Sequence, residues 1–382
     1  MRKWEDAHAS GSQHDSAWRI RKPDAGIAGK VFFRKKRSQL DLMLNAQKLL
    51  VVGPSWIGDM VMAQSLFKLL KQREPEIRID VLAPAWSEPL LARMPEVHRS
   101  ITIPVTHGEL ALGKRIAVGR RLRNEHYQQA IVMPRSLKSA LAPFFAGISV
   151  RTGFKGEWRY GLLTDIRHLD KVSLDQTVKR FLSLGLEPGE PLPPLPFPAL
   201  RIDENNRAGL LRRLNLTANP APVAMMPGAS FGPAKCWPLE HYAELARRVR
   251  AEGRPIWILG GKQDQAAGKL IQAKDLSGIH NLCGLTRLED TVDLLSLAAV
   301  TVTNDSGLMH VAAATAKHVV AIFGSTNPKF TPPLTERRTV QYLGLDCSPC
   351  FERLCPLEHF RCMKDISPTA VHAALMRLGG EY

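Results

Sequence analysis

Short apolar runs alternate with segments of helical spacing along most of this chain, and this alternation restricts the fold more than any other feature. Apolar runs bounded by turn residues are typical of buried parallel strands. The alternation therefore predicts an α/β fold with doubly wound parallel sheets. Strands are expected at 49–52, 77–82, 100–103, 129–133, 223–226, 256–259, 300–303 and 319–323, and helices at 60–71, 115–125, 239–251, 288–298 and 307–316.

A proline-rich stretch divides the alternation into two series. Residues 185–200 hold six prolines. Proline fixes φ and removes a hydrogen-bond donor, so neither a helix nor a central strand is expected there. We expect an N-terminal domain at 47–184 and a C-terminal domain at 201–382, with a ligand cleft at the carboxyl ends of both sheets. The last helix is a candidate to pack back on the N-terminal domain.

Residues 1–46 differ from the rest of the chain. They show no sustained periodicity and end in a basic run at 34–37, which is typical of a disordered basic extension. Met43 directly precedes the first strand, so a mis-assigned start codon is an alternative. The start lacks the apolar stretch of a secretory signal, and no apolar run reaches the roughly 20 residues that cross a bilayer. A cytoplasmic location is therefore expected.

The chain is strongly basic, with 52 Lys and Arg against 36 Asp and Glu and a formal net charge of +16. Residues 1–46 account for +5 of this charge, which leaves +11 on the remainder. Such an excess favours a polyanionic partner, such as nucleic acid, anionic lipid or a phosphorylated substrate. The basic residues are dispersed and form no compact basic-aromatic module, so nucleic acid is not the expected partner.

The first strand ends in a glycine-flanked turn, GPSWIGDM at 53–60. Its glycine spacing is superficially that of a phosphate-binding loop, which requires Lys and then Ser or Thr after the second glycine. Asp59 and Met60 stand there instead, and a carboxylate would repel a phosphate. Asp59 has two interpretations. It is either a first-turn residue stabilised by the helix dipole or a general base at the mouth of a ligand cleft.

Two turns in the second half carry groups that suit a nucleotide. The turn at 227–238, PGASFGPAKCWP, offers backbone N–H groups and Lys235 to an anion, although an ordinary loop with a solvated lysine fits equally. The turn at 259–264 ends in Asp264, which suits either a ribose or a helix N-cap. The glycine fingerprint of dinucleotide sites, G-x-G-x-x-G, is absent from the sequence, which disfavours an NAD-dependent oxidoreductase.

A third turn, TNDSGLMH at 303–310, follows a predicted strand directly. Asp305 is a candidate to bind sugar hydroxyls, while the N–H groups of Ser306 and Gly307 would face a diphosphate. In the alternative interpretation Asp305 is an N-cap and His310 an ordinary helix residue.

Cysteines cluster near the end of the chain. Cys347, Cys350, Cys355 and Cys362 have the spacing C-x2-C-x4-C-x6-C, with His359 nearby. Four thiolates suffice for a tetrahedral structural metal site, although this spacing matches no standard zinc motif. Disulfides and packed thiols are the alternatives. Sparse cysteine elsewhere fits a reducing compartment.

Taken together, these motifs resemble the ADP-heptose:lipopolysaccharide heptosyltransferases of glycosyltransferase family 9, most closely those that add the second heptose. The resemblance covers the chain in order from about Lys48 to about Leu334. It lies in the stretches GPSWIGDMVMAQSL, DVLAPAWSEPLLARMPEV, MPRSLKSALAPFFAGI with RTGFKGEWRYGLL, PGASFGPAKCWPLEHYAELA, VTNDSGLMHVAAA and FTPPL.

The resemblance implies a GT-B fold, in which two Rossmann-like domains face a central cleft. It implies inverting transfer, with the acceptor bound by the N-terminal half and ADP-heptose by the C-terminal half. Asp59 matches the catalytic base and Lys235 the lysine that stabilises the leaving diphosphate. The implied donor-binding residues are Ser230, Asp264, Thr286, Asp305, Ser306, Gly307 and His310.

The resemblance also implies a lipid A-linked inner-core acceptor, heptosyl-Kdo2-lipid A, met at the inner leaflet of the cytoplasmic membrane. Catalysis in the family needs no metal or other cofactor, so a metal at the cysteines would be structural. The rivals are heptosyltransferase I or another GT-B nucleotide-sugar transferase, and a non-catalytic nucleotide- or nucleic-acid-binding protein. The candidate acceptor-binding residues are Ser55, Trp56, Arg120, Arg123, Arg135 and Lys138.

Overall fold

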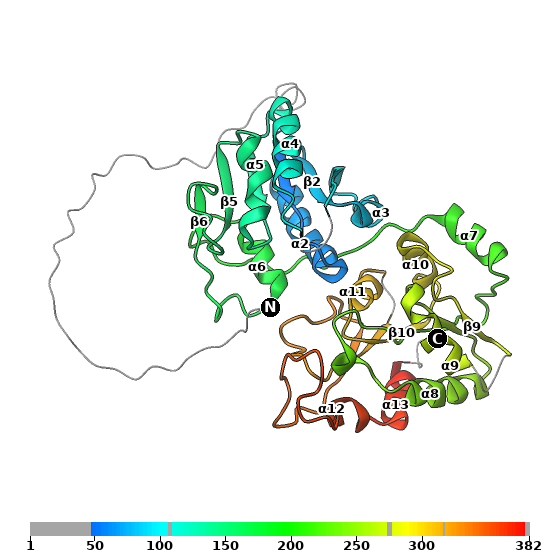
Figure 1. The fold of residues 1–382 in the computed structure, drawn as a ribbon. Helices are drawn as coiled ribbons and strands as arrows, with labels where there is room; N and C mark the ends of the chain where they lie inside the picture. The colour runs from blue at the N-terminus through cyan, green and yellow to red at the C-terminus, as the bar shows by residue number, and fades with distance from the viewer. Residues whose placement is uncertain (1–46, 106–108, 273–276, 316–317, 379–382) are drawn as a thin grey trace, which may run out of the picture. The chain divides into compact units, whose positions relative to one another are not determined.

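A computed structural model describes residues 47–105, 109–272, 277–315 and 318–378 (Figure 1). The described residues belong to one compact unit that holds two six-stranded parallel sheets. The strand orders are β3-β2-β1-β4-β5-β6 and β12-β11-β10-β7-β8-β9. In each sheet, the strand that comes first in the chain (β1 or β7) lies inside the sheet, and the later strands are added first on one side of it and then on the other. This is the arrangement of a Rossmann-like doubly wound sheet. The predicted α/β fold class is confirmed.

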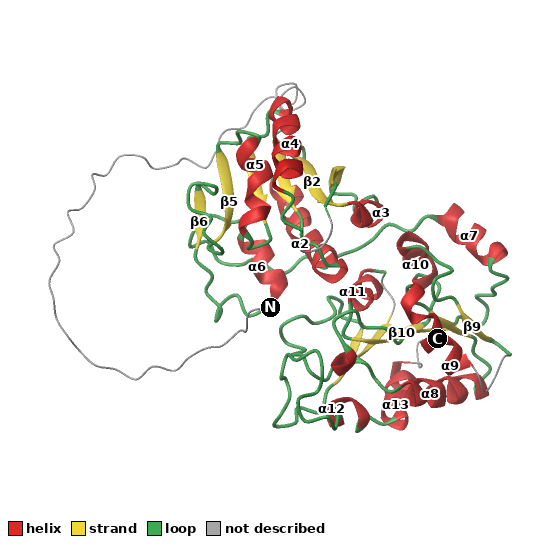
Figure 2. Ribbon diagram, viewed as in Figure 1, coloured by secondary structure: helices red, strands yellow, loops and turns green. Residues whose placement is uncertain are grey.

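The first sheet is covered on both faces (Figure 2). Helices α2 and α6 pack in the apolar cluster on one face, and α4 and α5 in the cluster on the other. The strands are β1 Lys48–Val52, β2 Arg78–Pro84, β3 Val97–Ile103, β4 Gln129–Val132, β5 Val150–Phe154 and β6 Asp165–Arg167. The helices are α2 Ile57–Arg73, α3 Glu88–Leu91, α4 Leu112–Leu122, α5 Leu141–Phe145 and α6 Thr177–Ser183.

The second sheet repeats this plan, with α10 and α11 on one face and α8, α9 and α13 on the other. The strands are β7 Val223–Met226, β8 Ile256–Ile258, β9 Ile279–Asn281, β10 Val300–Asn304, β11 His318–Ile322 and β12 Arg338–Gln341. The helices are α7 Glu204–Arg213, α8 Leu239–Ala251, α9 Gln265–Gln272, α10 Leu288–Leu295, α11 Gly307–Ala314, α12 Arg361–Lys364 and α13 Pro368–Leu378. Among the helices within these described ranges, none combines the length and apolarity that a membrane span requires.

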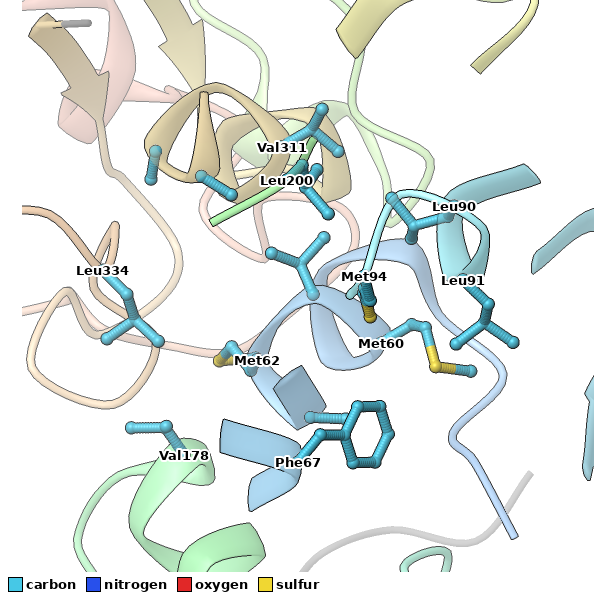
Figure 3. Close-up of a cluster of buried hydrophobic side chains, with 14 of the residues drawn as sticks. Met60, Met62, Phe67, Leu90, Leu91, Met94, Val178, Leu200, Val311 and Leu334 are labelled. Atoms are coloured by element: carbon cyan, nitrogen blue, oxygen red, sulfur yellow. The ribbon is translucent and has the colours of Figure 1, made fainter. Parts of the chain in front are cut away.

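Helix α2 is apolar on nearly all sides and is correspondingly buried along most of its length. It packs against α6 and against α11. Figure 3 shows Met60 and Met62 of α2 in one cluster with Val178 of α6 and Val311 of α11. A helix held from several sides keeps its first turn, which carries Asp59, in a fixed position.

The proline-rich stretch at 185–200 forms neither helix nor strand. Hydrogen bonds join the end of this stretch to α2 beside the first sheet and to α11 beside the second. The buried Gln64 of α2 accepts the N–H of Ala199 at 2.9 Å and donates to the Ala199 carbonyl at 2.8 Å. The N–H of Leu200 donates to the carbonyl of Ala314 in α11 at 3.0 Å.

The last helix does not pack where we expected. Helix α13 lies against α8 and β11 of the second half, so the prediction that it packs back on the N-terminal domain is wrong. Val371, Ala374 and Leu375 form an apolar stripe at helical spacing, and this stripe is buried in the cluster that contains Trp237.

Candidate active site

A cavity of about 470 Å³ lies at the carboxyl ends of strands from both sheets. The turn after β1 and the turns after β7, β8 and β10 line it. Parallel strands end at the same edge of a sheet, which explains why turns so distant in sequence meet. The lining includes Trp56, Asp59, Ser230, Lys235, Asp264, Thr286, Asp305, Ser306, Gly307 and His310.

The first turns of α2 and α11 meet beside this cavity. A Cβ atom at Gly58 would lie 2.6 Å from Cδ2 of His310, and one at Gly307 would lie 2.9 Å from Cβ of Ile57. Real side chains do not approach so closely, so the two glycines are required for this contact. The contact brings Asp59 and His310 to one cavity.

Asp59 lies in the first turn of α2. Burial raises the pKa of its carboxyl group to about 6, and the charge of Lys235 offsets part of this rise. The carboxylate is therefore ionised at neutral pH but holds a proton far more readily than an exposed aspartate. A pKa near the working pH suits a general base.

Lys235 pairs with Asp305 across the cavity. Its Nζ lies 2.6 Å from Oδ2 of Asp305, and the ammonium also lies 4.8 Å from the centre of the Phe231 ring. The hydroxyl of Thr326 donates to the same Asp305 oxygen at 2.5 Å. Thr326 follows β11, and nothing in the sequence singled it out.

We expect Thr326→Val to lower kcat about tenfold, because Asp305 loses a hydrogen bond from a buried hydroxyl and holds Lys235 less firmly. Thr326→Ser keeps the hydroxyl and is expected to stay close to the parent. Steady-state kinetics of both variants beside their thermal unfolding would check this. Equal kcat values for the valine and serine variants would show that the hydroxyl has no such role.

Asn304, at the end of β10, fixes the loop that carries Lys235. Its Oδ1 accepts from the N–H of Trp237 at 3.1 Å and from the hydroxyl of Tyr242 at 3.0 Å. Its Nδ2 donates to the carbonyl of Pro227 at 2.6 Å. Both ends of the 227–237 loop are thus tied to the strand that leads to Asp305.

Two buried polar atoms at the start of α11 lack a hydrogen-bond partner among the described residues, Oγ of the N-cap residue Ser306 and Nδ1 of His310. Burial lowers the pKa of His310 to about 4, so the ring is neutral at neutral pH. Ser306 makes no side-chain cap bond to its own helix. Together with the first N–H groups of α11, these atoms form a lining suited to an anionic group.

Asp264 lines the cavity and also forms a hydrogen bond within its own turn. Its Oδ2 accepts from the N–H of Gly261 at 2.8 Å, so the carboxylate closes the 262–264 turn from its last residue, whereas the N-cap of that turn is Gly261. Cβ atoms at Gly228 and Gly260 would lie 2.4 and 2.7 Å from its carboxylate oxygens. Burial raises the pKa of Asp264. Thr286, which also lines the cavity, has its hydroxyl 3.4 Å from that of Thr291.

The acceptor candidates divide into two groups. Ser55 and Trp56 follow β1, while Arg135 and Lys138 follow β4, the strand paired with β1, so these four lie at the carboxyl edge. Arg120 and Arg123 lie at the end of α4 and in the turn leading into β4. A helix between parallel strands returns to the edge where the strands begin. The expectation for Arg120 and Arg123 is therefore corrected, since they lie at the opposite edge from Asp59.

The four clustered cysteines and His359 line a separate cavity of about 20 Å³. All of these cysteines are free thiols. A tetrahedral site needs its sulfur atoms about 2.3 Å from one point, and no three His, Cys, Asp or Glu side chains in the described part of the chain are placed to hold a metal ion. A structural metal site at Cys347, Cys350, Cys355 and Cys362 therefore stays a prediction, beside disulfides and packed thiols.

Comparison with known proteins relates this chain and its fold to one family. Residues 115–361 match glycosyltransferase family 9 (heptosyltransferase). The lipopolysaccharide heptosyltransferase 2 of Escherichia coli K12 is 46% identical over 303 residues, which cover 77% of this chain and 87% of that protein. The lipooligosaccharide heptosyltransferase 2 of Haemophilus ducreyi is 44% identical over 307 residues, covering 77% and 88%. The structure of E. coli ADP-heptose LPS heptosyltransferase II matches with a TM-score of 0.78 and 41% identity, covering 87% of this chain and 98% of that one.

Proposed function

The chain belongs to glycosyltransferase family 9, the heptosyltransferases, and we propose that its cavity adds the second heptose of the lipopolysaccharide inner core. The enzyme transfers L-glycero-D-manno-heptose from ADP-heptose to the heptose of heptosyl-Kdo2-lipid A. The observation that carries this proposal is that Asp59, the Lys235–Asp305 pair and the first turn of α11 line one and the same cavity.

Asp59 is the general base in this proposal. The acceptor hydroxyl oxygen attacks the anomeric carbon of the donor as its proton passes to the Asp59 carboxylate. The bond from that carbon to the β-phosphate oxygen breaks on the opposite face, and ADP leaves. One displacement of this kind inverts the anomeric configuration.

Lys235 and the start of α11 stabilise the leaving diphosphate. Negative charge grows on the β-phosphate as the bond breaks, and an ammonium and helix N–H groups are placed to receive it. Asp305, which holds Lys235 at 2.6 Å, would accept hydrogen bonds from heptose hydroxyls. These groups supply the positive charge that a metal supplies elsewhere, so the proposal needs no cofactor.

The two halves divide the substrates. Residues 47–184 would bind the acceptor, with Arg135 and Lys138 facing its anionic groups, and residues 201–382 would bind ADP-heptose. The lipid end of the acceptor remains in the inner leaflet, so the enzyme would work as a peripheral protein at the cytoplasmic face of the membrane.

Activity should depend on pH through Asp59. The base acts only when ionised, and its pKa is raised to about 6. We therefore expect log(kcat/KM) to be level above that pH and to fall with unit slope below it. The measurement is kcat/KM for acceptor across the range in which the enzyme stays folded. If kcat/KM instead fell only near the pKa of an exposed aspartate, the assignment of Asp59 as the general base would be contradicted.

The acceptor assignment is tested by offering heptosyl-Kdo2-lipid A and Kdo2-lipid A separately and identifying the products by mass spectrometry and NMR. We expect heptose to be added only to the first, with an inverted anomeric centre. Efficient use of Kdo2-lipid A would support heptosyltransferase I instead. Tight, salt-sensitive nucleic-acid binding without turnover would favour the non-catalytic alternative.

A further inference from the structure

The cysteine-rich segment, residues 347–362, contacts the loop that carries Lys235. The Nε–H of Arg353 donates to the carbonyl of Phe231 at 2.7 Å. In return, the N–H of Ala234 donates to the carbonyl of Arg353 at 3.1 Å. Two hydrogen bonds therefore fix the backbone immediately before Lys235 from outside its own loop.

Gly232 lets the two backbones come this close. A Cβ atom there would lie 2.5 Å from the carbonyl oxygen of Arg353 and 3.0 Å from its Cβ. No other residue fits without displacing the segment. The close contact between the Lys235 loop and the backbone at Arg353 therefore requires glycine at position 232.

Phe231 links the two cations. Its ring centre lies 4.8 Å from Nζ of Lys235 and 5.5 Å from the guanidinium carbon of Arg353. A ring face attracts cations, and Arg353 also holds the carbonyl of the same residue. Arg353 therefore fixes both the backbone and the ring on which the Lys235 ammonium rests.

The same segment also supports the partner of Lys235. The hydroxyl of Ser348 donates to the carbonyl of Gly324 at 2.5 Å, and the N–H of Phe351 donates to the carbonyl of Ser325 at 2.6 Å. The next residue, Thr326, donates to Asp305. The segment is thus bonded to the loop that carries Lys235 and to the loop after β11, whose Thr326 holds Asp305.

We propose that the cysteine-rich segment positions the Lys235–Asp305 pair for heptosyl transfer, and that Arg353 is the positioning residue that fixes Lys235. This inference rests on the proposed function for its kinetic consequences, but not for its structural ones. It assigns the segment a purpose that does not depend on a metal or a disulfide.

The test compares Arg353→Ala with Arg353→Lys and with Arg361→Ala. Arg361 lies in the same segment but pairs with Asp365 at 2.9 Å. The first readout is amide hydrogen exchange of residues 228–238 in the protein without substrate. We expect faster exchange in Arg353→Ala, exchange close to the parent in Arg361→Ala, and partial recovery in Arg353→Lys.

The second readout is kinetic. A displaced catalytic lysine should lower kcat for ADP-heptose turnover by about 10- to 100-fold in Arg353→Ala, with partial recovery in Arg353→Lys. The fall in activity at acid pH (the acid limb of the pH profile) should also begin at a higher pH. The charge of Lys235 lowers the pKa of Asp59, and a displaced Lys235 would lower it less. A merely structural role would leave that limb in place.

These measurements can overturn the heptosyltransferase function and the positioning role of Arg353 independently of each other. Faster exchange in Arg353→Ala together with an inactive parent enzyme would overturn the heptosyltransferase function and keep the contact between segment and loop. An active parent whose Arg353→Ala variant keeps the parent's exchange, kcat and pH limb would overturn the positioning role alone. Equal losses in Arg353→Ala and Arg361→Ala would also overturn it.

Discussion

Asp59→Asn is expected to lower kcat by about 10³-fold, within the range for loss of a positioned general base. Asparagine has nearly the same shape as aspartate and keeps the first turn of α2 packed, so the change removes the proton acceptor and little else. The measurement is ADP release at saturating ADP-heptose and acceptor. ADP binding, measured by calorimetry, should stay near the parent value.

The same substitution should stabilise the fold. The carboxyl pKa is raised from 3.8 to about 6, so the native state prefers the protonated form, and ionisation costs stability as pH rises through this window. Above it the cost is constant. Because part of the side chain is exposed, we expect a gain of about 1–2 kcal/mol at neutral pH.

Glu88→Gln is the matched control for Asp59→Asn. Glu88 is an exposed acid in the first turn of the short helix α3 and lies outside the cavity. Its amide variant therefore also removes a carboxylate from the start of a helix. We expect its kcat to equal that of the parent. An Asp59→Asn variant that keeps more than a tenth of the parent kcat would remove Asp59 from the role of base.

Lys235→Met is expected to lower kcat by about 10²- to 10³-fold, the loss that follows removal of one preorganised donor to a developing negative charge. Methionine keeps much of the length of the side chain but no charge. Because the charge of Lys235 lowers the pKa of Asp59, the acid limb of the remaining activity should move to higher pH. Both changes are measured in one series of pH–rate profiles.

The control for Lys235 is Lys262→Met. Lys262 is an exposed lysine in the turn after β8, one residue from Gln263 of the cavity lining, so it tests general loss of positive charge near the site. We expect its kcat and acid limb to match the parent. A Lys235→Met variant with an unmoved limb would show that the ammonium does not face Asp59 during catalysis.

Much of the fold could be predicted because its strands are buried and apolar. Every predicted strand and helix is present within three residues at either end. The strands β6 and β9 have three residues each, too few to show a pattern, and β12 at the sheet edge is not buried throughout. Helix α13 was placed wrongly because an apolar stripe shows that a helix packs but not against which neighbour.

The site was predictable where a residue lies close after the carboxyl end of a strand, in the connecting turn or the first turn of the next helix, as Asp59, Asp264 and Asp305 do. Residues that act through others gave no local signal. Thr326 reaches Asp305 from another strand end, and Arg353 acts partly through its own carbonyl. The error at Arg120 and Arg123 came from treating charge as sufficient, when position along the helix decides which edge of the sheet a residue reaches.

Acceptor-dependent release of ADP tests the central claim most directly. The purified enzyme is mixed with ADP-heptose and excess EDTA, with and without heptosyl-Kdo2-lipid A, and ADP is followed over time. We expect rapid release only when the acceptor is present, unaffected by the chelator. Folded enzyme that released no ADP under these conditions, or released it equally without acceptor, would contradict heptosyl transfer at this cavity.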